Sequence, residues 1–228
     1  SIGGWNHKHQ FKEIHDFRSF AQAVKEFLLE HDFEFVDVDW EFETKDETLQ
    51  YSGQRFQLIL ELRGCLGDSF PIFMAIQANK EILRASCPSS VAPHVDCFIL
   101  MAYDFSGPWS DVARPHANLT QTDASLISID EIVEILSSEL GIPTNRLVLA
   151  VSGHRIVFSE CCGLGKPFKT ATIVSSKDFP SLRCSVNNFI TGETIESFEA
   201  KKEFVKANDL AGLCVWDIEA FSYLERSK

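Results

Sequence analysis

The sequence predicts an α/β protein, a (β/α)8 barrel of the TIM type, and three observations lead to that class. Short apolar segments of strand length recur along the 228 residues, as expected for strands buried on both faces of a parallel sheet. Amphipathic helical segments separate several of these strands, which is typical of repeated βα units. Gly3-Gly4 is too little for the Gly-rich phosphate turn of a doubly wound sheet, so a barrel is the favoured closure.

The first elements alternate helix and strand. Apolar residues at helical spacing predict an amphipathic helix over about residues 12–31. Residues 33–42 are rich in aromatic and β-branched side chains and alternate acidic with apolar from Val36 onward, which predicts a strand. A second helix is expected over about residues 46–63, ended by Gly64.

The remaining strands are short and apolar, and are expected at residues 70–76, 96–102, 146–151 and 211–216. Ser128 and Glu131 form a predicted capping box for a helix that ends at Gly141. With a strand at the start of the chain the count is six, whereas a complete barrel needs eight. The sequence contains no internal repeat and no clear linker, so residues 1–228 are expected to form a single domain.

Composition excludes several classes of function. The formal charge of −12, from 33 acidic and 21 basic side chains, would repel a phosphate backbone, so nucleic acid is not an expected partner. The longest apolar runs are far shorter than the ~18 residues of a membrane helix, so no membrane association is expected.

The cysteines and the start of the chain give information about the cellular compartment of the protein. The seven cysteines include no Cys-x-x-Cys pair, so no metal site is expected, although a disulfide could join two of Cys161, Cys162 and Cys184. The chain begins without Met and carries no signal peptide, and the sequon at Asn118 agrees with secretion. We therefore expect an extracellular protein whose signal peptide is not part of this chain.

Three acidic residues in the predicted strand carry the clearest chemical signal. Residues i, i+2 and i+4 of a strand point the same way, so Asp37, Asp39 and Glu41 are expected on one face, with Val38 and Trp40 opposite. Carboxylates roughly 6–7 Å apart along a strand in a partly desolvated cleft cannot all ionise cheaply, so at least one pKa must rise. A carboxylic acid with a raised pKa can protonate a leaving oxygen, as glycoside cleavage requires.

Two other interpretations of this acidic row remain open from the residues alone. The row could be a solvated strand face, although Trp40 and the surrounding phenylalanines fit that poorly. It could instead hold Mg²⁺ or Ca²⁺ through its oxygen atoms, which would need further carboxylates from elsewhere in the chain.

Four segments together resemble glycoside hydrolase family 18, the chitinases and chitinase-like lectins. Residues 34–41 (Glu-Phe-Val-Asp-Val-Asp-Trp-Glu) are similar to that family's DGxDxDWE signature. Residues 1–6 resemble its SIGGWN strand, residues 101–104 its MTYD strand, and residues 212–218 its final strand with a buried Trp. The resemblance implies that the chain runs from the third to the eighth barrel strand and lacks the first two βα units.

The resemblance also implies a substrate-assisted retaining mechanism for cleavage of β-1,4 linkages between N-acetylglucosamine units. Glu41 would protonate the glycosidic oxygen while the substrate's N-acetyl carbonyl attacks the anomeric carbon. Asp39 would bind the acetamide N–H and share charge and protons with Asp37. Tyr103 would hydrogen-bond the acetyl oxygen.

The substrate-binding residues implied by the resemblance are Trp5, Met101, Asp104 and Trp216. Trp5 would stack on a neighbouring sugar and Trp216 would form the apolar floor under the distorted ring, since aromatic faces bind the C–H side of pyranoses. The implied partner is chitin or a chito-oligosaccharide, with no cofactor, and the full-length protein is expected to be a monomer.

The sequence also departs from the family pattern. Glu34-Phe35 replaces the usual Asp-Gly, and residues 149–156 place His154 and Ile156 where the family has a sugar-binding Tyr and Arg. The insertion region, around residues 158–190, is short.

These departures keep a second interpretation open, a chitinase-like lectin that binds the same sugars without cutting them. A metal-dependent hydrolase using the acidic row is a third. A chain without two strands is further expected to fold poorly by itself.

Overall fold

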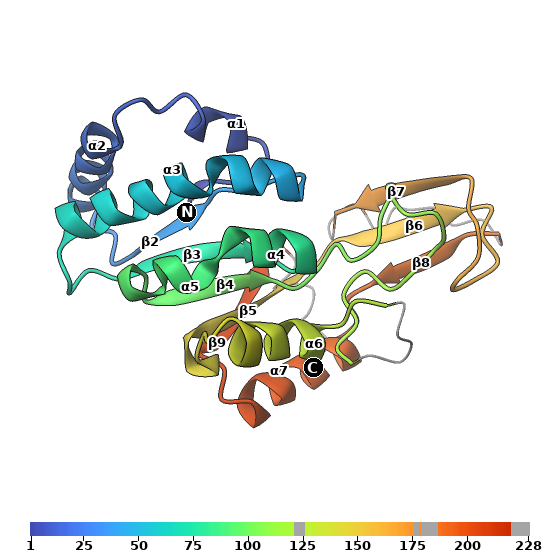
Figure 1. The fold of residues 1–228 in the computed structure, drawn as a ribbon. Helices are drawn as coiled ribbons and strands as arrows, with labels where there is room; N and C mark the ends of the chain where they lie inside the picture. The colour runs from blue at the N-terminus through green and yellow to red at the C-terminus, as the bar shows by residue number, and fades with distance from the viewer. Residues whose placement is uncertain (121–125, 176–177, 179–186, 220–228) are drawn as a thin grey trace. The chain divides into compact units, whose positions relative to one another are not determined.

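The computed structural model describes residues 1–120, 126–175, 178 and 187–219, and its central feature is a six-stranded sheet (Figure 1). The strand order is β1-β2-β3-β4-β5-β9, with β1 (Ile2–Gly3), β2 (Val36–Asp39), β3 (Ile72–Gln77), β4 (Cys97–Met101), β5 (Leu147–Ser152) and β9 (Gly212–Trp216). The strands are parallel, so the predicted α/β class and strand count are confirmed. Within the described residues this order does not close into a ring.

The chain forms two compact units. The first comprises residues 1–100 and 135–148, and the second comprises the described parts of residues 101–134 and 149–228. The predicted strand positions at β3, β4, β5 and β9 agree with the structure to within one or two residues. No described helix is both long enough and apolar enough to cross a lipid bilayer.

Helix α2 (Phe17–Glu30) confirms the helix expected over residues 12–31 but begins later, and the short helix α1 (Lys8–Phe11), which precedes that range, was not predicted. The long helix begins late because Asp16 caps it, its carboxylate accepting a hydrogen bond of 3.0 Å from the Ser19 backbone N–H. Its buried face, which includes Ala21, packs against α3.

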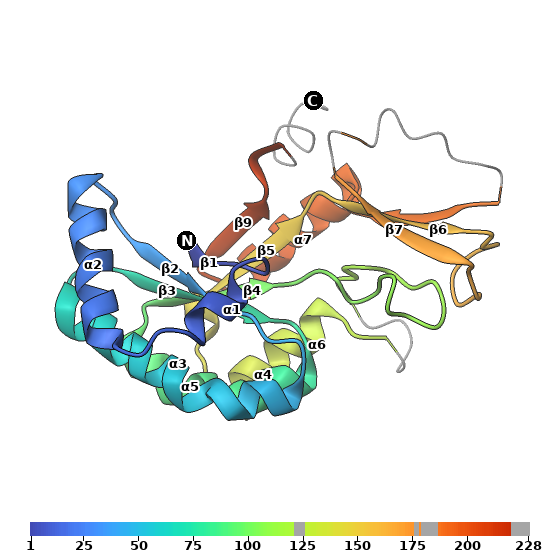
Figure 2. The same cartoon turned by 90° about the horizontal axis from the view of Figure 1, so that it is seen from above.

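Helix α3 (Lys45–Leu66) is longer than the expected 46–63. It continues through Gly64 and ends at Gly67, whose positive φ of 81° suits a residue without a side chain. Leu58, Ile59 and Leu62 are fully buried along one face of this helix. Figure 2 shows α3, α4 (Lys80–Ser86) and α5 (Pro88–Val91) along one side of β2 and β3. The first unit is completed by the short helices η1 (Ala92–His94), η2 (Ile135–Glu139) and η3 (Thr144–Arg146).

The strand predicted at residues 33–42 is too long by several residues at each end. Only Val36–Asp39 forms β2, while Phe33 and Phe35 are about half exposed, at 52% and 49%. The strand is short because its neighbour β1 offers only two residues for pairing, opposite Val38 and Asp39. Alternation of side-chain type therefore identified the right segment and overestimated how much of it is paired.

The second unit contains a small antiparallel sheet that the sequence did not predict. Strands β6 (Arg155–Ser159), β7 (Thr170–Val174) and β8 (Phe189–Gly192) pair in the order β7-β6-β8 (Figure 1). Most of β7 is exposed, so its sequence lacks a clear apolar alternation. A cluster of Ile156, Phe158, Ala113 and Cys161 anchors this sheet.

Two helices complete the second unit, α6 (Ile129–Glu134) and α7 (Ile195–Ala207). Helix α7 begins at a capping box between Thr194 and Ser197 and packs against β9. Cys161 and Cys162, considered above for a disulfide, are free thiols, and Cys184 lies outside the described residues.

Candidate active site

The acidic row lies at the end of β2 in the first unit. Asp37 and Asp39 belong to the strand, and Val38 and Trp40 are buried, at 0% and 2% exposure. Glu41 follows two residues after the strand ends and is partly buried, so it lies in coil and not in the predicted strand. The expected row of three thus has two members fixed by sheet pairing and a third carried by the segment that follows.

Burial dominates the electrostatics of this row. It raises the pKa of Asp37, although the Ser1 hydroxyl, which donates a hydrogen bond of 2.7 Å to Oδ2, opposes the shift. Burial, followed by the negative charges of Glu41 and Asp37, raises the pKa of Asp39 to about 7. The shifts of Asp37 and Asp39 thus agree in direction with the prediction that at least one carboxyl of the row has a raised pKa.

The buried oxygens of the row are poorly satisfied. Oδ1 of Asp37 and Oδ1 of Asp39 have no hydrogen-bond partner among the described residues. An unpaired buried carboxylate oxygen is costly. Both oxygens can be satisfied by a proton shared between the two acids or by a donor on a bound molecule.

Two glycines allow β1 to approach this row closely. Gly3 has a φ of 107°, and a Cβ added there would lie 2.4 Å from the backbone oxygen of Asp39. The backbone N–H of Gly4, which also has a positive φ, donates to that same oxygen at 2.8 Å. The Gly-Gly pair of the first motif therefore serves sheet pairing, because any side chain at Gly3 would push β1 away from β2.

The segment that carries Glu41 is held on both sides. Before it, the Trp40 ring stacks on Phe11 with centroids 4.8 Å apart. After it, the side-chain amide of Gln77 at the end of β3 pairs with the backbone of Phe42, one hydrogen bond in each direction and both 2.9 Å long. Gln77 thus takes the place of a strand neighbour just where the β2 pairing has ended.

Trp5 is half exposed, at 51%, and is not a core residue. The Lys8 ammonium nitrogen lies 3.0 Å from the centroid of its ring, a cation–π contact, and also pairs with Glu43 at 2.7 Å. Lys8 itself is almost fully buried, so it supports one face of the indole ring.

The other predicted residues belong to the second unit. Met101 ends β4, and Tyr103 and Asp104 follow it in coil, with a positive φ of 61° at Asp104. His154 Nε2 lies 2.8 Å from Asp104 Oδ1, and the Tyr103 ring meets the His154 ring edge-on with centroids 6.1 Å apart. Trp216 ends β9 and is 61% exposed, so the buried Trp that the resemblance implied for this strand is not buried in the structure.

Asp104 is the centre of a cluster with two histidines that sequence reasoning left without a role. His116 Nδ1 lies 3.6 Å from Asp104 Oδ1, and the imidazole rings of His116 and His154 lie side by side with centroids 4.7 Å apart. Burial by itself would raise the pKa of Asp104, but the adjacent imidazoles of His116 and His154 hold it well below its usual range. Burial lowers the pKa of His116.

The sequence contained only one hint of this cluster. His154 stood out as a departure from the family pattern, whereas His116 lies in a loop with no motif around it. Ile156, the other departure, is fully buried in the apolar cluster that anchors β6. A side chain packed there does not reach a bound sugar.

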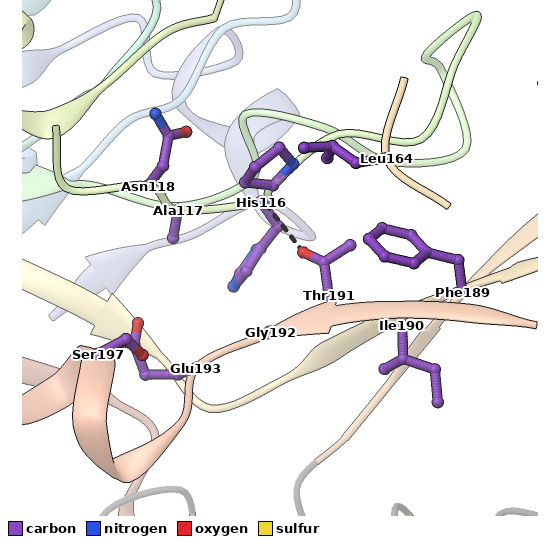
Figure 3. Close-up of a pocket in the computed structure, with 11 residues that line it drawn as sticks. His116, Ala117, Asn118, Leu164, Phe189, Ile190, Thr191, Gly192, Glu193 and Ser197 are labelled. Atoms are coloured by element: carbon purple, nitrogen blue, oxygen red, sulfur yellow. Dashed lines mark hydrogen bonds between the residues drawn. The ribbon is translucent and has the colours of Figure 1, made fainter. Parts of the chain in front are cut away.

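A pocket of about 340 Å³ lies wholly within the second unit (Figure 3). Figure 3 shows the His116 ring directed into it, next to Thr191, whose hydroxyl oxygen accepts a 3.0 Å hydrogen bond from the His116 backbone N–H. None of the predicted catalytic or substrate-binding residues lines this pocket, whose lining comprises Pro115, His116, Ala117, Asn118, Leu164, Phe189, Ile190, Thr191, Gly192, Glu193 and Ser197.

Comparison with known proteins gives one family. The model of glycosyl hydrolases family 18 matches residues 1–220. Endochitinase 1 of Metarhizium anisopliae is 25% identical over 252 aligned residues, which cover 95% of this chain and 60% of that protein. The chain therefore spans between 50% and 60% of the length of the curated relatives that it matches over nearly its whole length.

Solved structures agree on the fold. Chitinase ChiA74 from Bacillus thuringiensis superposes with a TM-score of 0.81 at 19% identity, covering 96% of this chain and 45% of that one. A mutant of catalytic domain 2 of the Ostrinia furnacalis group II chitinase gives a TM-score of 0.76 at 17% identity, covering 96% and 70% of the two chains. The predicted barrel class is confirmed by these structures, although the described residues supply six of its strands.

Proposed function

Because the chain belongs to glycosyl hydrolase family 18, we propose that it is a chitinase-type glycosidase. It cleaves β-1,4 linkages between N-acetylglucosamine units by a substrate-assisted retaining mechanism. The observation that carries this proposal is the acidic row, in which burial and neighbouring charge raise the pKa of Asp39 to about 7.

Glu41 is the proposed general acid. It gives its proton to the glycosidic oxygen as the bond from that oxygen to the anomeric carbon breaks. The carbonyl oxygen of the substrate's own N-acetyl group forms the new bond to the anomeric carbon, giving an oxazolinium ion. Water then attacks that carbon, and the Glu41 carboxylate takes the proton from the water. The protein supplies no nucleophile, since the acetamido group is already held next to the reacting carbon.

Asp39 and Asp37 are proposed to act on the acetamido group. With a pKa of about 7, Asp39 can hold a proton before substrate binds and release it as the positive charge develops. The ionised carboxylate then accepts the acetamide N–H and stabilises the oxazolinium ion, while Asp37 shares the proton. The unpaired Oδ1 atoms of both acids support this role, because a substrate donor can occupy them.

The binding roles proposed for the other residues follow from the family. Tyr103 hydrogen-bonds the acetyl oxygen, Asp104 contacts the sugar, and Met101 belongs to the same motif. Trp5 and Trp216 stack on sugar rings, and the exposure of their indoles, 51% and 61%, leaves ring surface accessible for this purpose.

The proposed substrate is chitin or a chito-oligosaccharide. The solved Ostrinia furnacalis domain is in complex with the chito-oligosaccharide (NAG)5, which supports this substrate class. The full-length protein is proposed to be monomeric and secreted.

The deciding experiment is release of a fluorophore from a chitotrioside by the Glu41→Gln variant. Loss of the general acid is expected to reduce kcat by about 100-fold or more, with chito-oligosaccharide binding retained because the amide has the same shape. Glu34→Gln, a change at an exposed carboxylate just before β2, is the matched control and should keep full activity. Full activity in Glu41→Gln would refute the mechanism.

A second function, a lectin that binds without cutting, is favoured by one observation. His154 holds Asp104 in a hydrogen bond of 2.8 Å, and Ile156 lies in the apolar core, so the sugar-binding pair of the family pattern is changed. Binding of wild-type protein to chitin beads without turnover of any chito-oligosaccharide would establish the lectin. Turnover that depends on Glu41 would exclude it.

A further inference from the structure

The cluster of Asp104, His116 and His154 has the composition of a transition-metal site. Each residue offers one ligand atom, and these atoms all lie within 4.8 Å of one another. Two separations are shorter, 2.8 Å from Asp104 Oδ1 to His154 Nε2 and 3.6 Å from the same oxygen to His116 Nδ1. Ligands placed tetrahedrally at zinc distances are about 3.4 Å apart. The 2.8 Å pair would therefore move slightly apart, and the wider separations, which reach at most 4.8 Å, would close.

The orientation of His116 suits a metal ligand. Its side chain is 1% exposed, and its Nδ1 accepts a long hydrogen bond of 3.4 Å from the Asp104 backbone N–H. As the acceptor in that contact, Nδ1 carries no proton on the side that faces Asp104, as a metal ligand requires.

The surroundings of the cluster support the same interpretation. The Ser152 hydroxyl hydrogen-bonds to His154 Nδ1 and leaves Nε2 directed at Asp104, as outer partners do in metal sites. The side chain of Asp104 is 39% exposed, which leaves room for a water as the fourth ligand. His116 also lines the 340 Å³ pocket, which offers an entry path.

A hydrogen-bond network alone explains the cluster less completely. The 3.6 Å separation between His116 Nδ1 and Asp104 Oδ1 is too long for a hydrogen bond. A divalent cation engages the carboxylate and both imidazole nitrogens at once.

We propose that Asp104, His116 and His154 bind one divalent transition-metal ion of the zinc type, with an open fourth position. Two imidazoles and one carboxylate favour Zn²⁺ over Mg²⁺ or Ca²⁺, which prefer oxygen ligands. This site contains no cysteine and no member of the acidic row considered above, and it shares Asp104 with the proposed sugar contact. It is tested by metal binding and not by turnover, so its failure and that of the proposed function are distinguishable.

The test is equilibrium dialysis of the whole chain against Zn²⁺, with bound metal measured by mass spectrometry. The wild-type protein is expected to bind one ion with a dissociation constant in the micromolar range or below. Asp104→Asn should weaken binding by roughly 100-fold or more, and Ser152→Ala, which removes only the outer hydrogen bond, by about tenfold.

His9→Ala is the matched control, because His7 and His9 are exposed histidines that could bind Zn²⁺ adventitiously. It should leave the affinity unchanged. Loss of binding in His9→Ala, unchanged binding in Asp104→Asn, or no binding by wild type would each overturn the proposal. Since Asp104 is partly exposed, its isosteric amide should preserve the fold, which circular dichroism checks. The visible absorption of bound Co²⁺ in wild type adds a test that needs no variant, and a spectrum without tetrahedral bands would contradict the site.

Discussion

Replacing Asp39 by Asn should make the protein more stable at neutral and alkaline pH. The folded state raises the pKa of Asp39 from 3.8 to about 7. The folded protein therefore keeps a proton that the unfolded chain has already released, so the free energy of unfolding falls as pH rises between these two values. At about 1.36 kcal/mol per pKa unit, the loss approaches 4 kcal/mol above pH 7. The asparagine variant has no carboxyl to ionise and avoids this loss.

Urea unfolding followed by tryptophan fluorescence from pH 4 to pH 9 measures the effect. Near pH 4 the two proteins should differ little, and near pH 8 the variant should be more stable by roughly 2–4 kcal/mol, since its amide must still be buried. Asp104→Asn is the control with the opposite sign, because the folded state lowers that pKa. It should cost stability at neutral pH, and the difference should shrink as the pH falls from 3.8 toward the lowered folded-state pKa, so this control is extended below pH 4. Parallel curves for wild type and Asp39→Asn would refute the reasoning.

Two further changes test the parts that hold the row, and a third tests a proposed sugar-binding residue. Gly3→Ala should cost about 3 kcal/mol in the free energy of unfolding, because its Cβ would lie 2.4 Å from a backbone oxygen. Gly53→Ala, at a helical position with no neighbour within 4 Å, should instead stabilise by about 0.5–1 kcal/mol in the same urea titration. Gln77→Met removes both side-chain hydrogen bonds to the coil after β2, so it should lower kcat about tenfold with little change in KM. An unaltered kcat would contradict this expectation. Trp5→Ala should weaken chito-oligosaccharide binding roughly tenfold by calorimetry, whereas Phe33→Ala, also at an exposed ring, should not.

Most of the sheet could be predicted from sequence because its strands are buried and short. Ile72, Met74 and Ile76 of β3, for example, are at most 3% exposed, and an apolar run of this length has few other places in a fold. Boundaries were less predictable where tertiary contacts set them. Helix α3 continues through Gly64, since the Thr44 cap and a buried apolar face outweigh the cost of one glycine.

The residues of the candidate site also fall into a group that the sequence could predict and a group that it could not. Asp37 and Asp39 could be placed on one face because the period of a strand is local. The cluster of Asp104, His116 and His154 could not, because its members are 12 and 50 residues apart in sequence and meet only through the fold. The bonds from Gln77 to the Phe42 backbone are of the same kind, since a side chain that replaces a strand partner leaves no periodic signal.

The acidic row lowers the folding stability of the first unit. Asp37 is 7% exposed, and its Oδ1, like that of Asp39, has no partner among the described residues. Replacing such acids by polar residues of the same shape should relieve repulsion and desolvation, so the row costs folding energy that the surrounding packing must offset. Trp40 and Phe11, stacked on the opposite side of the strand, supply part of that packing. An acidic group that the fold supports at such a cost is best explained by the reaction proposed for it, because a proton near pH 7 is available only while the carboxyls remain buried together.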